Sequence, residues 1–170
     1  MVTASMMTVG RSAGAESASA GQTASHALPS RSGSKSAALV LDLVTDRAGF
    51  DALADDWRAL FARAGQGAQA FQGYDWLWHW ANAYLAPSNG AGAPALAIVT
   101  VRRDGDLALV WPLVRERTAG LVTVGWMGAP VAQYGDVLVE PGADASELIA
   151  SAWRFLVARV RPDLVRLRKV

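Results

Sequence analysis

The polar residues best spaced for binding chemistry lie in the segment Gln133-Tyr134-Gly135-Asp136. Residues 135–139 are typical of a short strand, and side chains two positions apart on a strand project to the same face. Tyr134 and Asp136 would then flank a glycine that permits the close approach of another group. Because polar side chains are costly to bury without partners, two uses of this pair are open. The pair could bind a substrate, or it could be structural, with the tyrosine hydroxyl or a turn amide donating to the carboxylate.

A possible acid–base pair lies on the helix expected between Gly73 and Leu85. Asp75 and His79 are spaced i, i+4, so the carboxylate could orient the imidazole for base catalysis. An aspartate at a helix start beside a half-buried histidine explains the same spacing without catalysis, and this is the interpretation we favour because no nucleophile is in view. We therefore predict no catalytic residue in this chain.

The seven tryptophans could suggest sugar stacking, but most of them have a simpler explanation. Three occupy apolar helix stripes or a central strand and are expected in the core: Trp57, Trp111 and Trp153. Trp76, Trp78 and Trp80 cannot all face one core from a single helix. One of them is therefore expected to line a cleft or a domain interface, and we take Trp76 as a candidate substrate-binding residue.

Composition excludes several kinds of site. The chain has no cysteine, which rules out disulfides, thiol catalysis and cysteine-ligated metals, and with only two histidines we expect no metal site. The net charge of +1 gives no global field to recruit nucleic acid. The longest apolar run, Leu107 to Val114, is far short of the roughly 18 residues that suggest a membrane span. We expect a cytoplasmic protein.

The last residues of the chain are basic, with Arg166, Arg168 and Lys169 offset only by Asp163. A phosphate or nucleic-acid patch is one interpretation of this cluster. An interface or a solvated edge strand is the other, and it is the one we favour.

The first 38 residues differ from the rest of the chain. They are rich in Ser, Ala, Gly and Thr and show no apolar periodicity, and no continuous apolar core of a secretory signal is present. Glu16 and the many glycines argue against a transit peptide. We expect residues 1–38 to be a disordered tail or an over-extended start, and we confine the fold to residues 39–170.

The ordered part is organised around Ala95 to Val114, where two apolar runs flank Asp104-Gly105. This dipeptide predicts a two-residue type I′ hairpin whose facing pairs are Arg103 with Asp106, Val101 with Ala108 and Val99 with Val110. Both faces of the hairpin are apolar, so we expect the sheet to be covered on both sides. Pro112 lacks an N–H group, and the second strand should bulge or leave the pairing there.

The other elements follow from apolar periodicity and capping residues. Helices are expected from Thr45-Asp46 to about Arg63, from Gly73 to Leu85, and from an Asp144-x-x-Glu147 capping box to Pro162. Further strands are expected at 38–44, 121–127, 135–139 and 163–170. This order predicts an α/β domain with one mixed, mostly antiparallel sheet flanked by helices, truncated after the last strand.

Several short motifs recur here in one order. They are Trp57-Arg58-Ala59-Leu60, Phe71-Gln72, Asp75-Trp76-Leu77 with Trp80, Trp111-Pro112-Leu113, Met127-Gly128-Ala129-Pro130, Tyr134-Gly135-Asp136 and Arg161-Pro162-Asp163. In their order and spacing they resemble the N-terminal half of the CelD-type cellulose-biosynthesis acyltransferases, a FemAB-like branch of the GNAT acetyltransferase superfamily. The resemblance covers about Leu39 to Val170 and implies a GNAT-like fold.

The resemblance also implies two GNAT-like halves in tandem, with acetyl-CoA or another acyl-CoA held by the second half, which this chain lacks. The superfamily holds the pyrophosphate on a Q/R-x-x-G-x-G/A loop between a strand and a helix. This sequence does not supply that loop, because Arg11 to Gly14 lies in the tail and Arg63 to Gly67 follows a helix. Alone, the chain is therefore expected to be inactive.

By the same resemblance, the full-length protein would transfer an acyl group to an acceptor of a cellulose or exopolysaccharide pathway, or to an amine. Gln133, Tyr134, Asp136 and Trp76 would then bind the acceptor, on the face turned toward the missing half. Two other functions remain open. One is a non-catalytic GNAT-like binding or assembly module, and the other is FemAB-like aminoacyl transfer to peptidoglycan.

Overall fold

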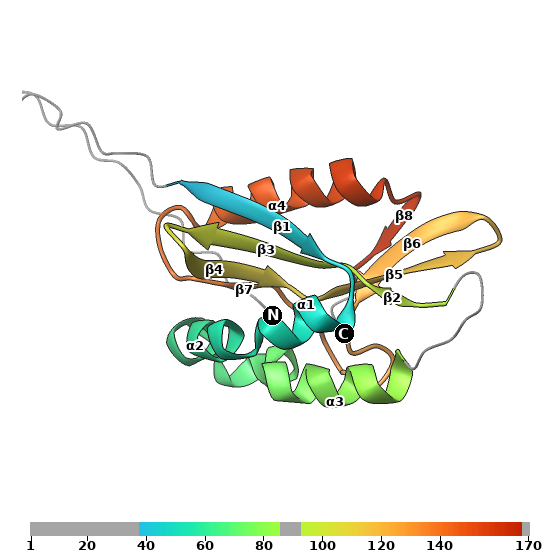
Figure 1. Ribbon diagram of the computed structural model, residues 1–170, viewed down its shortest axis with the longest axis horizontal. Helices are drawn as coiled ribbons and strands as arrows, with labels where there is room; N and C mark the ends of the chain where they lie inside the picture. Colours follow the sequence, from blue (N-terminus) through green and yellow to red (C-terminus); the bar gives the residue numbers. More distant parts are fainter. Residues whose placement is uncertain (1–37, 86–92, 168–170) are drawn as a thin grey trace, which may run out of the picture. The chain divides into compact units, whose positions relative to one another are not determined.

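The computed structural model describes residues 38–85 and 93–167, all within the compact unit Ser36–Val170 (Figure 1). The helices are α1 (Arg47–Ala52), α2 (Ala54–Ala64), the 3-10 helix η1 (Gly67–Gln72), α3 (Tyr74–Tyr84) and α4 (Ala145–Val160). The strands are β1 (Leu39–Val44), β2 (Ala95–Leu96), β3 (Ile98–Arg103), β4 (Asp106–Trp111), β5 (Leu113–Thr118), β6 (Leu121–Trp126), β7 (Leu138–Val139) and β8 (Leu164–Arg166). The tail predicted over residues 1–38 lies outside the described residues up to position 37, as do Arg168 and Lys169.

The predicted α/β class is confirmed, but the strands form two sheets where we expected one. Their orders are β1-β3-β4-β7 and β2-β5-β6-β8, and of the described ladders only β6 with β8 is parallel. The chain passes from the first sheet to the second at Pro112, as its missing N–H predicts. The carbonyl of Pro112 accepts from Met127 N at 3.0 Å, which anchors the crossing point.

The central hairpin has the predicted turn and a different register. Asp104 and Gly105 have φ values of 51° and 99°, and Arg103 lies opposite Asp106. A bulge then shifts the ladder, so that Val101 faces Leu109 and not Ala108. Ala108 and Leu109 consequently both pack in the core beneath α4. The bulge is what allows two consecutive residues to face the same layer.

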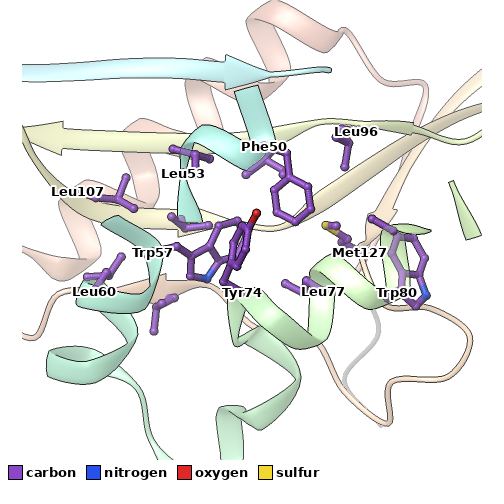
Figure 2. Packing of buried hydrophobic residues seen from close by; sticks show 14 residues of the cluster. Phe50, Leu53, Trp57, Leu60, Tyr74, Leu77, Trp80, Leu96, Leu107 and Met127 are labelled. Atoms are coloured by element: carbon purple, nitrogen blue, oxygen red, sulfur yellow. The ribbon is translucent and has the colours of Figure 1, made fainter. Parts of the chain in front are cut away.

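The first sheet is covered on both faces, as the apolar hairpin predicts. In Figure 1, α4 lies on one side of the first sheet and α1 to α3 lie on the other. The core beneath α1 to α3 centres on the aromatic side chains of Phe50, Trp57 and Tyr74, which contact one another at centroid distances of 5.1–5.9 Å (Figure 2). Trp57 is fully buried, and its indole N–H donates to Gln72 O at 2.9 Å. Burial of each large side chain of this kind contributes about 1.5–3 kcal/mol.

The helix boundaries partly match the predictions. The Asp46 carboxylate caps α1 by accepting from Gly49 N at 2.7 Å, but a break at Leu53 divides the predicted helix into α1 and α2. The predicted capping box at the start of α4 is wrong. Asp144 makes no side-chain cap there, because its carboxylate pairs with Arg103 from the central hairpin.

Two further expectations about position are wrong. Trp153 packs against Trp111 at a centroid distance of 6.2 Å, but 40% of it is exposed, so it is not a core residue. The predicted strand 135–139 is reduced to β7, and Tyr134 and Asp136 lie in the loop before it. The reason is that its partner strand β4 ends at Trp111: in the register that pairs Leu138 with Val110, Asp136 would face Pro112, which has no N–H group.

Strand β6 confirms the strand predicted at 121–127, but β5 was not predicted, and so neither was the hairpin that the two strands form. Strand β5 follows Pro112 directly and turns into β6 through Ala119 and Gly120, whose φ values are 52° and 86°. The 3-10 helix η1 was not predicted either. No helix in the described residues is long and apolar enough to cross a membrane.

Candidate functional site

A cavity of about 470 Å³ lies between α3, the second sheet and the loop 129–135, and we call it the α3 cleft. Four aromatic side chains line it: Trp80, Tyr84, Trp126 and Tyr134. The rings of Trp80 and Tyr84 stack with an interplanar angle of 13° and a centroid distance of 5.5 Å. Trp80 also closes one end of the core beneath α1 to α3 (Figure 2). Such a cleft suits a ring or an apolar chain, because aromatic faces supply large rigid contact areas.

The second sheet forms the floor of the cleft. Glu116 on β5 lies opposite Thr123 on β6, and Val114 lies opposite Gly125. On the other side of β6, Gly125 pairs with Arg166 of β8. All five residues line the cleft, as expected from the two-residue period of strands. Because Gly125 has no side chain, the floor is open between the two charged residues.

The floor carries one residue of each charge. Neither Glu116 nor Arg166 makes an ion pair or a side-chain hydrogen bond to any other described residue. Thr123, between them, is buried with 8% of its surface exposed. The cleft therefore offers an acceptor group, a donor group and a hydroxyl that the described part of the fold does not use.

Two cleft residues also carry unused donors. Among the described residues, the buried indole N–H groups of Trp80 and Trp126 have no hydrogen-bond partner. Leaving a buried donor unpaired costs about 1–3 kcal/mol. The core residue Trp111 also has an unpaired indole N–H, so this feature is not confined to the cleft.

The structure does not bring the four predicted substrate-binding residues together in one site. Gln133 and Tyr134 line the α3 cleft, whereas Trp76 lines a second, shallower hollow of about 560 Å³ beside α2 and η1. Phe71 connects them, because its ring contacts both Trp76 and Tyr134 edge-on at 5.1 Å.

Asp136 lies behind the cleft and not in its lining. Its carboxylate accepts from Val137 N at 2.9 Å and from Gln69 Nε2 at 3.3 Å. The predicted structural use, a backbone amide donating to this carboxylate, is therefore present. These contacts join the loop to η1.

A buried glutamine fixes the same loop from the other side. The Gln72 side chain is buried, with 2% of the residue exposed. In the amide orientation that pairs both its oxygen and its nitrogen, the nitrogen donates to Gln69 O at 3.0 Å and the oxygen accepts from Asp136 N at 3.2 Å. The backbone carbonyl of Gln72 accepts a hydrogen bond from the indole N–H of Trp57. The position of Tyr134 in the cleft thus depends on a hydrogen-bond chain that starts in the core.

Asp75 is engaged by an arginine. Arg58 Nη2 donates to its carboxylate at 2.6 Å, and this hydrogen bond is the main reason that the pKa of Asp75 is below its usual range. His79, nearby, also lowers the pKa of Asp75, but it makes the smallest contribution to the shift. Both the ion pair and the carboxylate are on the surface, which agrees with the structural interpretation of the Asp75 and His79 spacing.

The sequence patterns do not single out Glu116 or Gly125. Glu116 is on β5, which was not predicted, although the alternation of Val114 and Glu116 with Arg115 and Arg117 could have identified a strand. Gly125 is on the strand predicted at 121–127, but a glycine without a side chain gave no sign of a site. Arg166 was noted only as part of a basic terminus. Its partner across the floor is decided by the parallel pairing of β6 and β8, which no local pattern encodes.

The described residues contain no group of three or more His, Asp or Glu placed to hold a metal ion. Gly65 follows α2 and Gly67 begins η1, so these glycines follow a helix and do not form a strand–loop–helix phosphate site. No family model, no curated protein and no solved structure matches this chain.

Proposed function

We propose that this chain is the acceptor-binding half of a GNAT-like acyltransferase, with the α3 cleft as the acceptor site. The observation that carries the proposal is the cleft itself, which has aromatic walls, an unpaired carboxylate on its floor and two of the predicted acceptor residues, Gln133 and Tyr134, in its lining. The family resemblance supplies the reaction class, and a second GNAT-like domain would supply the acyl-CoA.

The division of labour follows from the chemistry of the cleft. Glu116 accepts a hydrogen bond from an amine or hydroxyl of the acceptor, and the aromatic walls exclude water around it. The acyl group would come from acetyl-CoA or another acyl-CoA bound outside these residues. In keeping with the resemblance, the acceptor belongs to a cellulose or exopolysaccharide pathway or is a small amine.

Two calorimetric titrations of the chain test this proposal, one with acetyl-CoA and one with glucosamine, a primary amine on a saccharide ring. We expect no acetyl-CoA site and a weak glucosamine site that Tyr134→Phe weakens further. A 1:1 acetyl-CoA site with a micromolar dissociation constant, about −8 kcal/mol, would overturn the division into donor and acceptor halves.

A non-catalytic binding module is the second candidate. It is favoured by the position of Asp75, which Arg58 holds at the surface and which is absent from the cleft lining. Glu116 is the only carboxylate among the described residues of that lining. A full-length protein that binds amines in the cleft but transfers no acetyl group to them would favour this candidate.

A further inference from the structure

The α3 cleft holds one negative and one positive side chain on the same floor, and their spacing is set by the sheet. Glu116 is on β5 and Arg166 is on β8, on opposite sides of β6 and two residues out of step. Two strand spacings and a two-residue offset separate their Cα atoms by about 12 Å. The two charges can meet each other only if both side chains lie flat across Gly125.

Gly125 leaves that central position empty. A Cβ atom added there would find only the Arg166 carbonyl oxygen, at 3.7 Å, so the floor has room for further atoms between the charges. Val114, opposite Gly125 on β5, and Thr123, two residues before it on β6, complete this part of the floor. The stacked rings of Trp80 and Tyr84 form the wall next to it.

From this arrangement the geometry points to a small zwitterion as the ligand of the α3 cleft. Its cationic amine binds Glu116, its carboxylate or phosphate binds Arg166, and a ring or short apolar body lies over Gly125 against the aromatic wall. The inference rests on the proposed function in that it names the class of acceptor, but it concerns binding and needs no acyl transfer.

Charge complementarity favours a ligand with both charges over a ligand with one. A purely cationic ligand leaves the Arg166 guanidinium without a partner, and a purely anionic ligand leaves the Glu116 carboxylate without one. Each charge-assisted hydrogen bond should change affinity by about tenfold or more. The guanidinium is suited to a planar carboxylate or to a phosphate, and both are included in the predicted class.

A panel of three related compounds tests the inference on the full chain. The probes are 4-(aminomethyl)benzoate, benzylamine and benzoate, which share the ring and carry both charges, the cation alone or the anion alone. We expect calorimetry to give a dissociation constant for the zwitterion at least about tenfold below either of the others.

The variants assign each charge to its side chain. Glu116→Gln should weaken the zwitterion and benzylamine and leave benzoate unchanged, while Arg166→Gln should weaken the zwitterion and benzoate and leave benzylamine unchanged. Arg117→Gln is the matched control, because Arg117 is on β5 as well but lines a different hollow. Gly125→Val should abolish binding of all three probes without lowering the melting temperature, since the added side chain fills the floor.

The inference is overturned if the three probes bind equally, if none binds, or if Gly125→Val binds them as wild type does. Acetyl-CoA binding to the chain would contradict the proposed function and leave these results untouched. Conversely, a chain that binds glucosamine but shows no preference for the zwitterion retains the proposed function and loses this inference.

Discussion

Replacing Gly135 with alanine should disrupt the loop that carries Tyr134 into the α3 cleft. The new Cβ atom would lie 2.3 Å from Cγ and Cδ2 of Trp126 and 2.8 Å from Cδ1. An ordinary carbon–carbon contact is about 3.5–4.0 Å, so the loop or the ring must move by more than about 1 Å. The indole cannot retreat freely, because Trp111 packs against it at a centroid distance of 6.4 Å.

The expected cost combines two effects. Overpacking costs about 1–3 kcal/mol, and moving the loop away also strains the buried hydrogen bond from Asp136 N to Gln72. We therefore expect Gly135→Ala to lose about 2–4 kcal/mol of unfolding free energy, which for a domain of this size corresponds to roughly 10 °C in melting temperature.

Urea unfolding followed by tryptophan fluorescence and by far-ultraviolet circular dichroism measures this loss. Gly125→Ala is the matched control, because its Cβ would have only an ordinary 3.7 Å contact and a strand alanine stabilises relative to glycine. Equal urea midpoints for Gly135→Ala and wild type would refute the close packing of the loop against Trp126.

Two further predictions concern single side chains. Asp136→Asn should lower the unfolding free energy by about 1–3 kcal/mol, because the carboxylate accepts hydrogen bonds from Gln69 and Val137. Tyr134→Phe should change the unfolding free energy by less than about 0.5 kcal/mol and instead weaken amine binding. Urea titration and calorimetry of both variants check this, and the reverse pattern would contradict it. Hydrogen bonding from Arg47 is the main cause that lowers the pKa of Asp51. The stabilisation by Asp51 is therefore present above its unfolded pKa and is lost as the pH falls through its lower folded pKa. In Asp51→Asn, the unfolding free energy should therefore fall less steeply below about pH 4 than in wild type. The difference should be less than about 1 kcal/mol, since the carboxylate is half exposed. Urea midpoints that fall as steeply in the variant as in wild type across that range would contradict this.

The features that the sequence could predict are those that depend on neighbouring residues. The turn at Asp104-Gly105, the departure of the chain at Pro112 and the cap at Asp46 each follow from the backbone chemistry of one or two residues, and the structure confirms them. The helix expected to begin at Gly73 is confirmed for the same reason.

The features that the sequence could not predict depend on contacts between distant segments. The bulge at Ala108 is favoured by packing beneath α4, and the cap at Asp144 is lost because Arg103 takes its carboxylate. Similarly, the strand expected from Gly135 is shortened because its partner β4, far away in the sequence, ends at Trp111. None of these partners is visible in a local pattern.

The candidate site was predicted in part. Gln133 and Tyr134 do line a cavity, because the glycine after them permits the close approach that the sequence suggested. Trp76 lies in a different hollow, and Trp80, four residues later on α3, takes the place in the cleft wall. Which of the neighbouring tryptophans faces the cleft depends on how α3 sits on the sheets, and this is settled only by the assembled core.

The most direct test of the α3 cleft as an acceptor site is a nuclear magnetic resonance titration of the chain with ¹⁵N-labelled indole groups. Trp80 and Trp126 line the cleft, whereas Trp57 is in the core and Trp153 is on α4. On addition of glucosamine, we predict concentration-dependent shifts of the Trp80 and Trp126 indole signals and unchanged signals from Trp57 and Trp153. Shifts confined to Trp153, or no shift of any indole signal at saturating amine, would contradict the assignment of the cleft.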